Sequence, residues 1–435
     1  MADFEYYLAQ FVDIHGRPKA KLVPGKHKEM IFGAGAGFAG FAIAGMGMEP
    51  HGREFMAIGD RDSIRPVPWM SSTASVVCDG HVDGKPHAFD SRVIAKKALA
   101  DFRETTGLEF FTGLEPEFFL LRPGATAGSW IVATESESLD KPCYDFHHLS
   151  SVSDFLMELR GALGSAGIDV YQIDHEDANG QFEMNFTYAD GLRTADNLTY
   201  FKMAAQAIAR KYGLLCSFMP KPFAERSGSG LHMHMSAGME FGDNAFQDAS
   251  DSRGMGLSQL AYHFLGGLIA HASGLTAIAA PCVNSYRRLV SRGSRSGATW
   301  APINIAWGDN NRTAFVRIPG GRLELRVPDA SANPYLLTAA VIHAGLDGIR
   351  RKLDPGQPCN ENLYQLSLAE LAARGIKRLP ASLPDALNAL EADQTLCKGL
   401  GADFVAEFAE IKRAEWDEML FVVPTAEFRR YVDFF

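Results

Sequence analysis

Paired cysteines are missing from this sequence. Six cysteines occur among its 435 residues, and no two of them form a Cys-x-x-Cys pair. A disulfide framework or a zinc site built on such pairs is therefore not expected. Isolated thiols are typical of a reducing compartment, so the sequence predicts a cytoplasmic protein.

Long apolar runs, positive net charge and a cationic leader are missing too. The most apolar stretch, residues 265–283, contains His271 and Pro281, which favours a buried helix running into a loop over a membrane span. The net charge of −10 argues against nucleic-acid binding. The start, MADFEYYLAQFVDIHG, has no cationic segment before an apolar one, so a signal peptide is not expected.

The common nucleotide-binding signatures are absent or incomplete. No Gly-x-x-x-x-Gly-Lys-Ser/Thr motif occurs, which excludes a P-loop enzyme. Gly35, Gly37 and Gly40 spell Gly-x-Gly-x-x-Gly, and Asp60 lies twenty residues further on. Later glycines and Pro50 break any helix after this motif, so a dinucleotide-binding fold is not predicted.

The chain is long enough for two domains, and 46% of its residues are apolar. Short apolar runs separated by Gly, Pro and Asp predict a β-rich N-terminal unit. A helix is predicted over residues 90–106, and we place the domain boundary there, giving residues 1–106 and 107–435. Further helices are predicted at residues 153–166, 194–212, 256–273, 334–352, 384–393 and 402–420.

The central stretch is YQIDHEDANGQFEMNF, residues 171–186, which reads as a β-hairpin. Asn179-Gly180 favours a type I′ turn, and counting outward from it places Glu176 directly opposite Glu183. Like charges in such a pair are destabilising, so a divalent cation between them is indicated. Two alternatives remain open: the register slips by one residue, or the carboxylates turn into water.

Three other predicted strands place polar groups at a two-residue period, which brings them to one face. The groups are Glu115 and Glu117 in GLEPEFFLL, His232, His234 and Ser236 in GLHMHMS, and Arg322, Glu324 and Arg326 in GRLELRV. The carboxylates and imidazoles are ligands for two divalent metals, and the arginines are partners for anions. This combination is typical of phosphoryl transfer. The alternative is a set of ordinary amphipathic strands with a solvated face.

These segments resemble the successive signatures of the glutamine synthetase superfamily, in the family's order and over nearly the whole chain. The similar segments are GLEPEFF, DHEDANGQFE, FMPKPF, SGSGLHMHMS, NSYRRL, NNRTAFVRIP, RLELRVPDASANPYL and NENLYQL. The resemblance implies an ATP-dependent ligase that activates the γ-carboxylate of glutamate as an acyl phosphate, which an amine then attacks. It also implies ATP and two to three Mg²⁺ or Mn²⁺ ions as cofactors.

The resemblance implies a role for each matching residue. One metal would be held by Glu117, Glu176 and Glu183, and a second by Glu115, His232 and Glu324. Glutamate would contact Gly228, Arg288 and Arg326, and the nucleotide would contact His234, Ser236, Arg317 and Arg322. The residues expected to act in catalysis are Arg312, which would stabilise the transferred phosphoryl group, Glu176 and Trp300.

The family fold is of the α+β class. It implies a small N-terminal β-grasp domain and a large catalytic α/β domain with a strand-built funnel. The family also implies active sites between neighbouring subunits of a ring, and a dodecamer of two hexameric rings. Neither a nucleic acid nor a membrane is an expected partner.

The sequence departs from the family pattern where ammonium binds. Ala39 and Phe41 align with an Asp-Gly-Ser-Ser motif, so the aspartate is replaced, and Trp300 stands where a glutamate precedes Ala-Pro. Ser227 replaces the usual asparagine of the glutamate loop. With Tyr144 retained, the pocket favours a methyl- or alkylamine.

The sequence is most similar to the γ-glutamylmethylamide synthetase branch, which is grouped with type III glutamate–ammonia ligases. A glutamine synthetase using ammonia and a γ-glutamylpolyamine synthetase remain alternatives. A non-catalytic family member and a two-metal hydrolase are the rivals from other classes. Tyr364 matches a position adenylylated in some bacterial relatives, and the final EFRRYVDFF is expected to dock on a partner ring or to pack locally.

Overall fold

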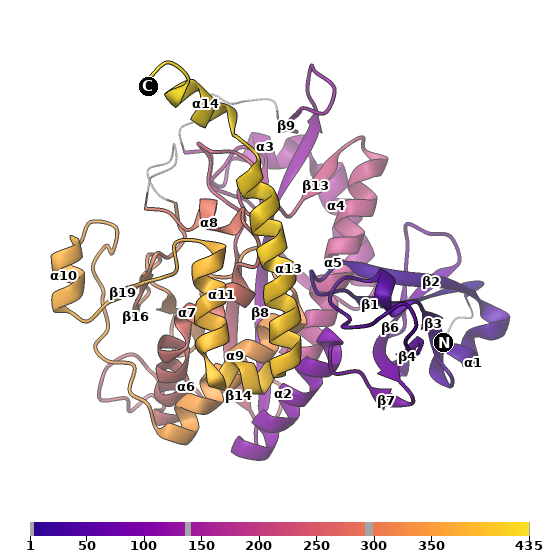
Figure 1. Cartoon of the computed structure of the whole chain (residues 1–435), viewed down its shortest axis with the longest axis horizontal. Helices are drawn as coiled ribbons and strands as arrows, with labels where there is room; N and C mark the ends of the chain where they lie inside the picture. Colours follow the sequence, from indigo (N-terminus) through magenta and orange to yellow (C-terminus); the bar gives the residue numbers. More distant parts are fainter. Residues whose placement is uncertain (1–3, 135–140, 292–298, 435) are drawn as a thin grey trace.

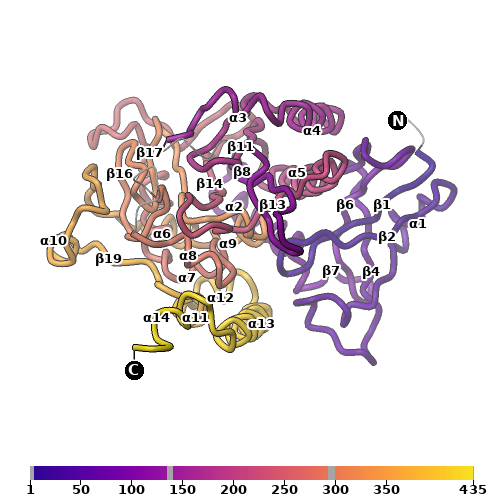
Figure 2. Tube along the Cα trace, turned by 90° about the horizontal axis from the view of Figure 1, so that it is seen from above, coloured from indigo at the N-terminus to yellow at the C-terminus, as the bar shows by residue number. Residues whose placement is uncertain are grey.

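The computed structural model describes residues 4–134, 141–291 and 299–434, which form two lobes (Figures 1 and 2). Figure 2 shows the N-terminal lobe, in indigo, beside the larger lobe that carries the rest of the chain. Among the described residues, no helix combines the length and the apolar character needed to cross a bilayer.

The N-terminal lobe is built on a seven-stranded sheet with the order β2-β1-β6-β4-β3, in which β5 and β7 also pair with β6. Only β1 and β6 run parallel. The elements are β1 (Tyr6–Val12), β2 (Pro18–Pro24), η1 (Gly25–His27), α1 (Lys28–Phe32), β3 (Ala36–Phe38), η2 (Gly40–Ala42), β4 (Phe55–Gly59), η3 (Arg61–Ser63), β5 (Arg65–Pro66), β6 (Thr73–Val82) and β7 (Lys85–Pro86). Alternate residues of β1 enter a separate apolar core, which confirms the predicted β-rich unit.

The larger lobe is built on a ten-stranded sheet with the order β10-β11-β8-β14-β18-β17-β16, in which β9, β12 and β13 also pair with β8. The strands are β8 (Glu109–Pro123), β9 (Trp130–Val132), β10 (Val170–His175), β11 (Gln181–Phe186), β12 (Ala189–Asp190), β13 (Leu215–Ser217), β14 (Leu231–Gly238), β16 (Trp307–Asp309), β17 (Val316–Ile318) and β18 (Leu323–Leu325), with β15 (Asn304–Ile305) and β19 (Lys377–Arg378) forming a separate pair. The long strand β8 is the centre of this sheet.

Helices pack against the apolar face of the sheet and against one another (Figure 1). They are α2 (Ser91–Thr106), α3 (Phe146–Ser151), α4 (Ser153–Ser165), α5 (Gly191–Lys211), α6 (Gln259–Ala270), α7 (Ala272–Ala279), α8 (Ser285–Arg288), α9 (Pro334–Arg351), α10 (Leu368–Ala373), α11 (Leu383–Ala392), α12 (Gln394–Leu400), α13 (Ala402–Phe421) and α14 (Thr425–Tyr431). The six predicted helices of the larger lobe exist. The one predicted over 256–273 is broken at His271, after which α7 continues through the apolar stretch.

Helix α2 connects the two lobes. It begins after Asp90, whose side chain accepts a hydrogen bond from the N–H of residue 93, and it ends at Gly107, as predicted. Arg92 is buried and forms ion pairs with Asp60 at 2.8 Å and Asp196 at 3.0 Å. Because Asp60 belongs to the N-terminal lobe and Asp196 to α5, this arginine fastens one lobe to the other.

Candidate active site

Strand β8 carries two carboxylates at the centre of the site. Phe118 is buried in the core, so the alternation of a strand turns Glu115 and Glu117 to the opposite face. Glu117 lies directly opposite Glu183 of β11, and Glu115 lies opposite His232 of β14. The predicted metal ligands of three strands therefore meet on one face of the sheet.

The predicted register of the hairpin is wrong. Asp174, and not Glu176, lies opposite Glu183. The N–H of Glu176 donates to the carbonyl oxygen of Gln181 at 2.9 Å, so the turn holds two more residues than expected. Gly180 has a φ of +78° but the residue before it has no positive φ, so a type I′ turn does not form. A shift of two residues preserves the face, so the carboxylates still point into the site.

Two imidazoles hold the carboxylate of Glu115. His234 Nε2 lies 2.8 Å from Glu115 Oε1, and His232 Nδ1 lies 3.3 Å from Oε2. Arg322 Nε donates to His234 Nδ1 at 3.1 Å, so neutral His234 carries its proton on Nε2 and donates it to Glu115. Burial alone would raise the pKa of Glu115, but the hydrogen bonds from both histidines outweigh it and lower that pKa. Glu115 is therefore ionised and ready to bind a cation.

Glu324 is fully buried on β18 and is held by two guanidinium groups. Arg317 Nη1 lies 2.8 Å from Glu324 Oε2, and Arg326 Nη1 donates to Oε1. Burial opposes ionisation, but the charge of Arg326 and of the other nearby cations lowers the pKa of Glu324. His232 Nδ1 lies 3.8 Å from Glu324 Oε1. Arg326 Nε also donates to the carbonyl oxygen of Arg312 at 3.2 Å, and the side chain of Arg312 is exposed.

Carboxylates nearer the hairpin have the opposite pKa shift. Burial and the charge of Glu117 raise the pKa of Glu176 to about 8. Burial, followed by the charges of Glu176, Glu115 and Glu117, raises the pKa of Glu183 well above its ordinary value. The side chains of Arg and His nearby do not fully neutralise this group of carboxylates. A divalent cation bound among them would stabilise the ionised forms of Glu176 and Glu183.

The ligand atoms are close enough to share such ions. Those of Glu115, Glu183 and His232 lie within 4.8 Å of one another, and so do those of Glu115, His234 and Glu324. Each of these two groups shares members with the predicted ligand sets. The assignment of individual residues to the first or the second metal differs from the predicted one. The predicted division between the two metals stays a prediction.

Gly230 leaves a hollow beside these groups. A Cβ atom at this position would lie 2.9 Å from Glu117 Oε1, 3.0 Å from Arg288 Nη2 and 3.2 Å from His232 Nε2. A carboxylate, a guanidinium and an imidazole therefore converge on one point that a side chain would fill. This donor set fits a divalent cation next to an anionic substrate.

Arg288, one of the predicted glutamate-binding residues, borders this hollow. Arg288 is buried and donates to the carbonyl oxygens of residues 326–327, at distances of 3.2 and 2.9 Å. Gln181 Nε2 donates to Glu117 Oε2 at 2.7 Å and to the carbonyl oxygen of Gly228 at 3.1 Å. Gln181 was not predicted as a site residue. In the sequence this residue directly follows the turn residues Asn179-Gly180, and nothing there indicates a binding role. Its partners Glu117 and Gly228 are distant in sequence and meet it only in the folded chain.

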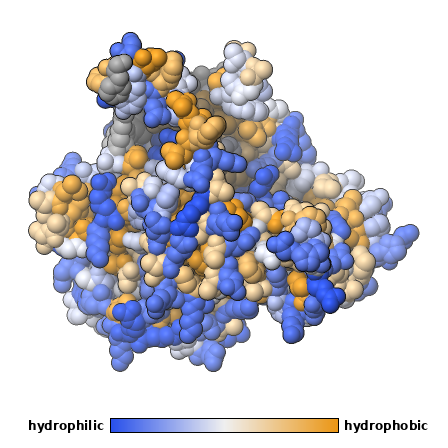
Figure 3. All heavy atoms as spheres, viewed as in Figure 1, coloured by the Kyte–Doolittle hydropathy of each residue, from blue (hydrophilic) through white to orange (hydrophobic). Residues whose placement is uncertain are grey.

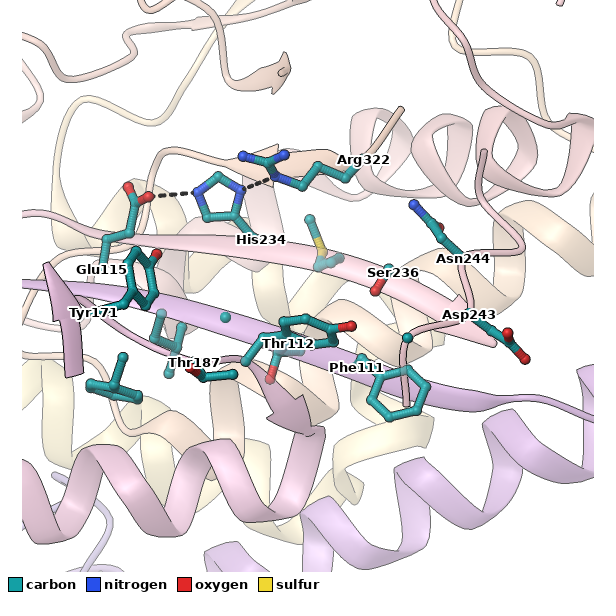
Figure 4. A pocket seen from close by; sticks show the side chains of 16 residues that line it. Phe111, Thr112, Glu115, Tyr171, Thr187, His234, Ser236, Asp243, Asn244 and Arg322 are labelled. Atoms are coloured by element: carbon teal, nitrogen blue, oxygen red, sulfur yellow. Dashed lines mark hydrogen bonds and ion pairs between the residues drawn. The ribbon is translucent and has the colours of Figure 1, made fainter. Parts of the chain in front are cut away.

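A pocket of about 510 Å³ opens beside the cluster (Figure 4). Its walls include His234, Ser236 and Arg322, three of the four residues predicted to bind the nucleotide. In Figure 4 the side chains of Glu115, His234 and Arg322 form one hydrogen-bonded row along its edge. Arg317, the fourth predicted residue, is not among the lining residues and instead binds Glu324.

The sequence analysis missed the aromatic residues that line the same pocket, which are Phe111, Tyr171, Phe186 and Tyr188. Phe241 is not part of the lining but contacts two of them. Tyr188 stacks on Phe241 with ring centroids 4.7 Å apart and an interplanar angle of 20°, and Phe111 meets Tyr188 edge-on at 6.1 Å. Flat aromatic surfaces of this kind suit a nucleobase. Periodicity gave no signal for them, because Phe241 comes from the loop after β14 and meets Tyr188 only in the folded chain.

The residues predicted to select the amine lie on three segments. Phe41 on η2, Tyr144 before α3, and Trp300 are 53%, 72% and 40% exposed. Tyr144 and Trp300 have φ values of +65° and +57°, which are rare for bulky side chains and concentrate at functional sites. Within the described part of the chain, no ring contact joins the three side chains.

The flap that contains Trp300 is described only in part, because residues 292–298 lie outside the described ranges. Next to Trp300, the carbonyl oxygen of Ala301 accepts a hydrogen bond from Tyr364 Oη at 2.6 Å. The hydroxyl of Ser227, the residue that replaces asparagine, donates to the carboxylate of Asp177 in the hairpin turn.

Residues 88–431 match the sequence model of the family "Glutamine synthetase, catalytic domain". The chain belongs to the glutamine synthetase family. Among its relatives, glutamate–methylamine ligase of Methyloversatilis universalis is 53% identical over 432 residues, covering 99% of this chain and 97% of that protein. Glutamine synthetase of Rhizobium meliloti is 41% identical over 415 residues, covering 95% of this chain and 93% of that protein.

Solved structures of the family agree with this membership. A GmaS/ADP complex superposes with a TM-score of 0.92 at 44% identity, covering 99% of this chain and 97% of that chain. Apo GmaS without ligand gives a TM-score of 0.88 at 42% identity, with the same coverage. The predicted family resemblance is confirmed, and the mixed helix and sheet fold is that of glutamine synthetase family members.

Proposed function

We propose that this enzyme joins a small alkylamine, methylamine foremost, to the γ-carboxylate of L-glutamate. A γ-carboxylate oxygen attacks the γ-phosphorus of ATP and ADP leaves, giving γ-glutamyl phosphate. The amine nitrogen then attacks the acyl carbon, phosphate leaves, and the nitrogen loses a proton. The observation that carries this proposal is the 53% identity to a glutamate–methylamine ligase over 99% of the chain.

The polar face of the sheet supports this chemistry. We assign one of two to three Mg²⁺ or Mn²⁺ ions to Glu117, Glu176 and Glu183, and another to Glu115, His232 and Glu324. When bound, such ions neutralise phosphate oxygens and the charge that develops on them. Burial and the hydrogen bonds described above hold these side chains in place before the substrates arrive.

The positions of the side chains support the other assigned roles. The pocket of His234, Ser236 and Arg322 suits ATP. We assign Arg317 to the phosphates, and its contact with the proposed metal ligand Glu324 supports this role. The hollow at Gly230, beside Gly228, Arg288 and Arg326, suits the glutamate. The exposed guanidinium of Arg312 is assigned to the transferred phosphoryl group, and Glu176 and Trp300 complete the catalytic set.

Selection of the amine rests on two missing carboxylates. Ala39 and Trp300 stand at the family's acidic positions, so the pocket lacks the charges that favour ammonium. Aromatic groups at Phe41, Trp300 and Tyr144 would instead contact a methyl group and a cationic amine. Since Phe41 lies on the N-terminal lobe without a ring contact to the other two, we assign its role to the site of a neighbouring subunit.

A homo-oligomer with active sites between subunits follows from this assignment, and we propose the family's dodecamer of two hexameric rings. Apolar side chains gather on the surface where α13 runs into α14 (Figure 3). Phe421, Val423 and Phe428 are 90%, 69% and 58% exposed there. A partner ring would cover this surface.

Several predictions about organisation are retained as proposals. The N-terminal sheet with its single α-helix supports a β-grasp domain, and the polar face of the larger sheet supports a strand-built funnel. The division into residues 1–106 and 107–435 stays a prediction, as does a cytoplasmic location. Neither nucleic acid nor membrane is proposed as a partner.

The first experiment measures ADP release by the purified protein with ATP, Mg²⁺ and glutamate, comparing methylamine with ammonium and a diamine. Use of methylamine at far lower concentration than ammonium is the expected result. Equal or better use of ammonium would make the enzyme a glutamine synthetase, and preference for the diamine would make it a polyamine synthetase. ADP release without any amine would indicate a hydrolase.

A further inference from the structure

A second cavity, of about 960 Å³, lies outside the site described above. It is lined by the β1–β2 turn of the N-terminal lobe, by α5 and α13, and by the segments that follow α7 and β18. Trp69, Phe218 and Phe408 contribute apolar walls. Its size is in the range of small-molecule sites, and its place between the two lobes is typical of them.

Positive charge dominates the lining of this cavity. Arg17, Lys202, Arg210 and Lys412 line it, and Glu415 is the one acidic residue among its described lining residues. The carboxylate of Glu415 is paired with the buried Lys412, whose Nζ lies 3.1 Å from Glu415 Oε2. Arg17 and Arg210 are exposed and form no ion pair within the described chain. Arg17 and Arg210 therefore line the cavity without a carboxylate partner, and the charge of the buried Asp329 acts on the third cation, Lys202.

Lys202 is the innermost of the three. Its Nζ donates to the carbonyl oxygens of Ala330 at 2.7 Å and Ala332 at 3.4 Å, and it lies 5.5 Å from the ring centroid of Phe218. Burial lowers its pKa to about 8, so most of the population is still an ammonium ion at neutral pH. The charge of Asp329 opposes this shift, but Lys202 forms no ion pair among the described residues. An ammonium whose hydrogen bonds go to carbonyl groups has capacity for an anion.

We propose that this cavity binds a small organic anion with at least two carboxylate or phosphate groups, and that the anion is an effector of the enzyme. Arginine guanidinium groups at the mouth bind such groups in a bidentate manner, and Lys202 supplies a point charge further in. The aromatic walls contact the hydrocarbon portion of the ligand. Like charges that share one cavity repel, so neutralising them favours the bound state.

A short backbone path connects the cavity to the candidate active site. The carbonyl groups that Lys202 holds belong to Ala330 and Ala332, which follow Arg326 closely in sequence. The N–H of Ala330 donates to the carbonyl oxygen of Ser229 at 3.2 Å, next to the hollow at Gly230. An anion that draws Lys202 away would loosen this segment, so the KM for glutamate should rise. This consequence, unlike the binding itself, rests on the proposed function.

Trp69 in the cavity wall provides a direct readout. The full-length protein is titrated with citrate and with fructose 1,6-bisphosphate, without substrates or metal, against sodium chloride at equal ionic strength. A saturable change in tryptophan fluorescence is expected with either probe, and Trp69→Phe should abolish the change while calorimetry still detects binding. A response to one probe only would identify the preferred anionic group.

Charge variants decide whether the cavity is the site. Arg210→Glu should weaken binding at least ~10-fold, whereas Arg122→Glu, an equal charge change at the exposed end of β8 outside the cavity lining, should not. Failure of both probes to bind, or equal binding by the two variants, would overturn the site. Binding without any change in the glutamate KM, at fixed free Mg²⁺, would contradict the connection to the active site. Neither binding result depends on which amine the enzyme uses.

Discussion

The guanidinium of Arg326 donates through Nη2 to the carbonyl oxygen of Trp300, at 3.3 Å. Through Nη1 the same group donates to the buried carboxylate of Glu324. One arginine thus links a candidate metal ligand to the residue that we propose stands in place of the family's glutamate in the flap. Trp300 has a positive φ, and this contact holds its carbonyl oxygen.

Replacing Trp300 tests whether an aromatic surface selects the methylated amine. Trp300→Ala should lower kcat/KM for methylamine about tenfold more than for ammonium, since a buried methyl group contributes ~0.8 kcal/mol and a cation–π contact ~0.5–1 kcal/mol. Steady-state kinetics with both amines measure the ratio. Trp130→Ala on β9 removes an equally exposed indole elsewhere and should leave the ratio unchanged. Equal losses with both amines in Trp300→Ala would refute the selective role.

Ala39 gives the converse test. Ala39→Asp places a carboxylate where we propose that the family's aspartate stands. The preference should therefore move toward ammonium by about tenfold, the effect of one partly desolvated charge pair of ~1–2 kcal/mol. The measurement is again the ratio of kcat/KM for methylamine to kcat/KM for ammonium. An unchanged ratio would mean that the alignment of this loop is wrong.

Filling the hollow at Gly230 should stop the reaction without unfolding the protein. The Cβ of Gly230→Ala would lie within 3.2 Å of Glu117, Arg288 and His232, all of which are held by other contacts. We expect turnover to fall at least ~100-fold, because displacing positioned groups by a fraction of an ångström has effects of this size. Gly161→Ala on α4, where no atom lies within 4 Å of the added Cβ, is the matched control. Near-normal turnover in Gly230→Ala would remove the hollow from the active site.

Glu117 should be required for metal-dependent turnover. Glu117→Gln keeps the side-chain volume but removes the charge, so activity should fall at least ~100-fold and the Mg²⁺ concentration for half-maximal activity should rise. A metal titration monitored by activity and by calorimetry separates the two effects. Glu240→Gln, an exposed carboxylate outside the cluster, should match the unaltered enzyme in both. Unaltered Mg²⁺ affinity in Glu117→Gln would contradict the assignment.

His271 should make stability depend on pH. Its Nε2 lies 3.0 Å from Asp347 Oδ2, and its Nδ1 lies 2.7 Å from Asp393 Oδ2. Burial lowers the pKa of His271, but the hydrogen bonds to both carboxylates outweigh this effect and raise the pKa above the ordinary 6.5. Because the folded-state pKa is raised, the stabilisation is complete below the unfolded value and is lost as the pH rises through the folded value.

The measurement is unfolding by denaturant across that pH range. His271→Gln should lower the free energy of unfolding by about 3 kcal/mol on the acidic side, the cost of removing one partner of a buried ion pair, and by less on the alkaline side. Thr276→Val, which removes a hydrogen bond to the carbonyl oxygen of Ala272 and no titratable group, is the control and should show a constant difference. A constant difference for His271→Gln would contradict the pH dependence.

Local patterns predicted much of the fold. The helices over residues 90–106 and 334–352 were predicted from capping signals and periodicity, and both exist, as α2 and α9. The shared faces of Glu115 with Glu117 and of His232 with His234 follow from a period of two, which holds in any strand. Hairpin register was predicted wrongly, because the conformation of the residue before Gly180 is set by the contacts of the turn and not by its identity alone.

The sequence by itself determined which groups the site contains, because strand periodicity brings carboxylates, imidazoles and guanidinium groups to one face wherever those strands pair. Tertiary structure alone decided which of them meet. The order β11-β8-β14-β18 places Glu183 beside Glu117 and His234 beside Glu324, and no pattern within a single strand encodes that order. The stacking of Tyr188 on Phe241 and the cationic cavity between the lobes arise in the same way, since their parts are distant in sequence and meet only when the apolar core has formed.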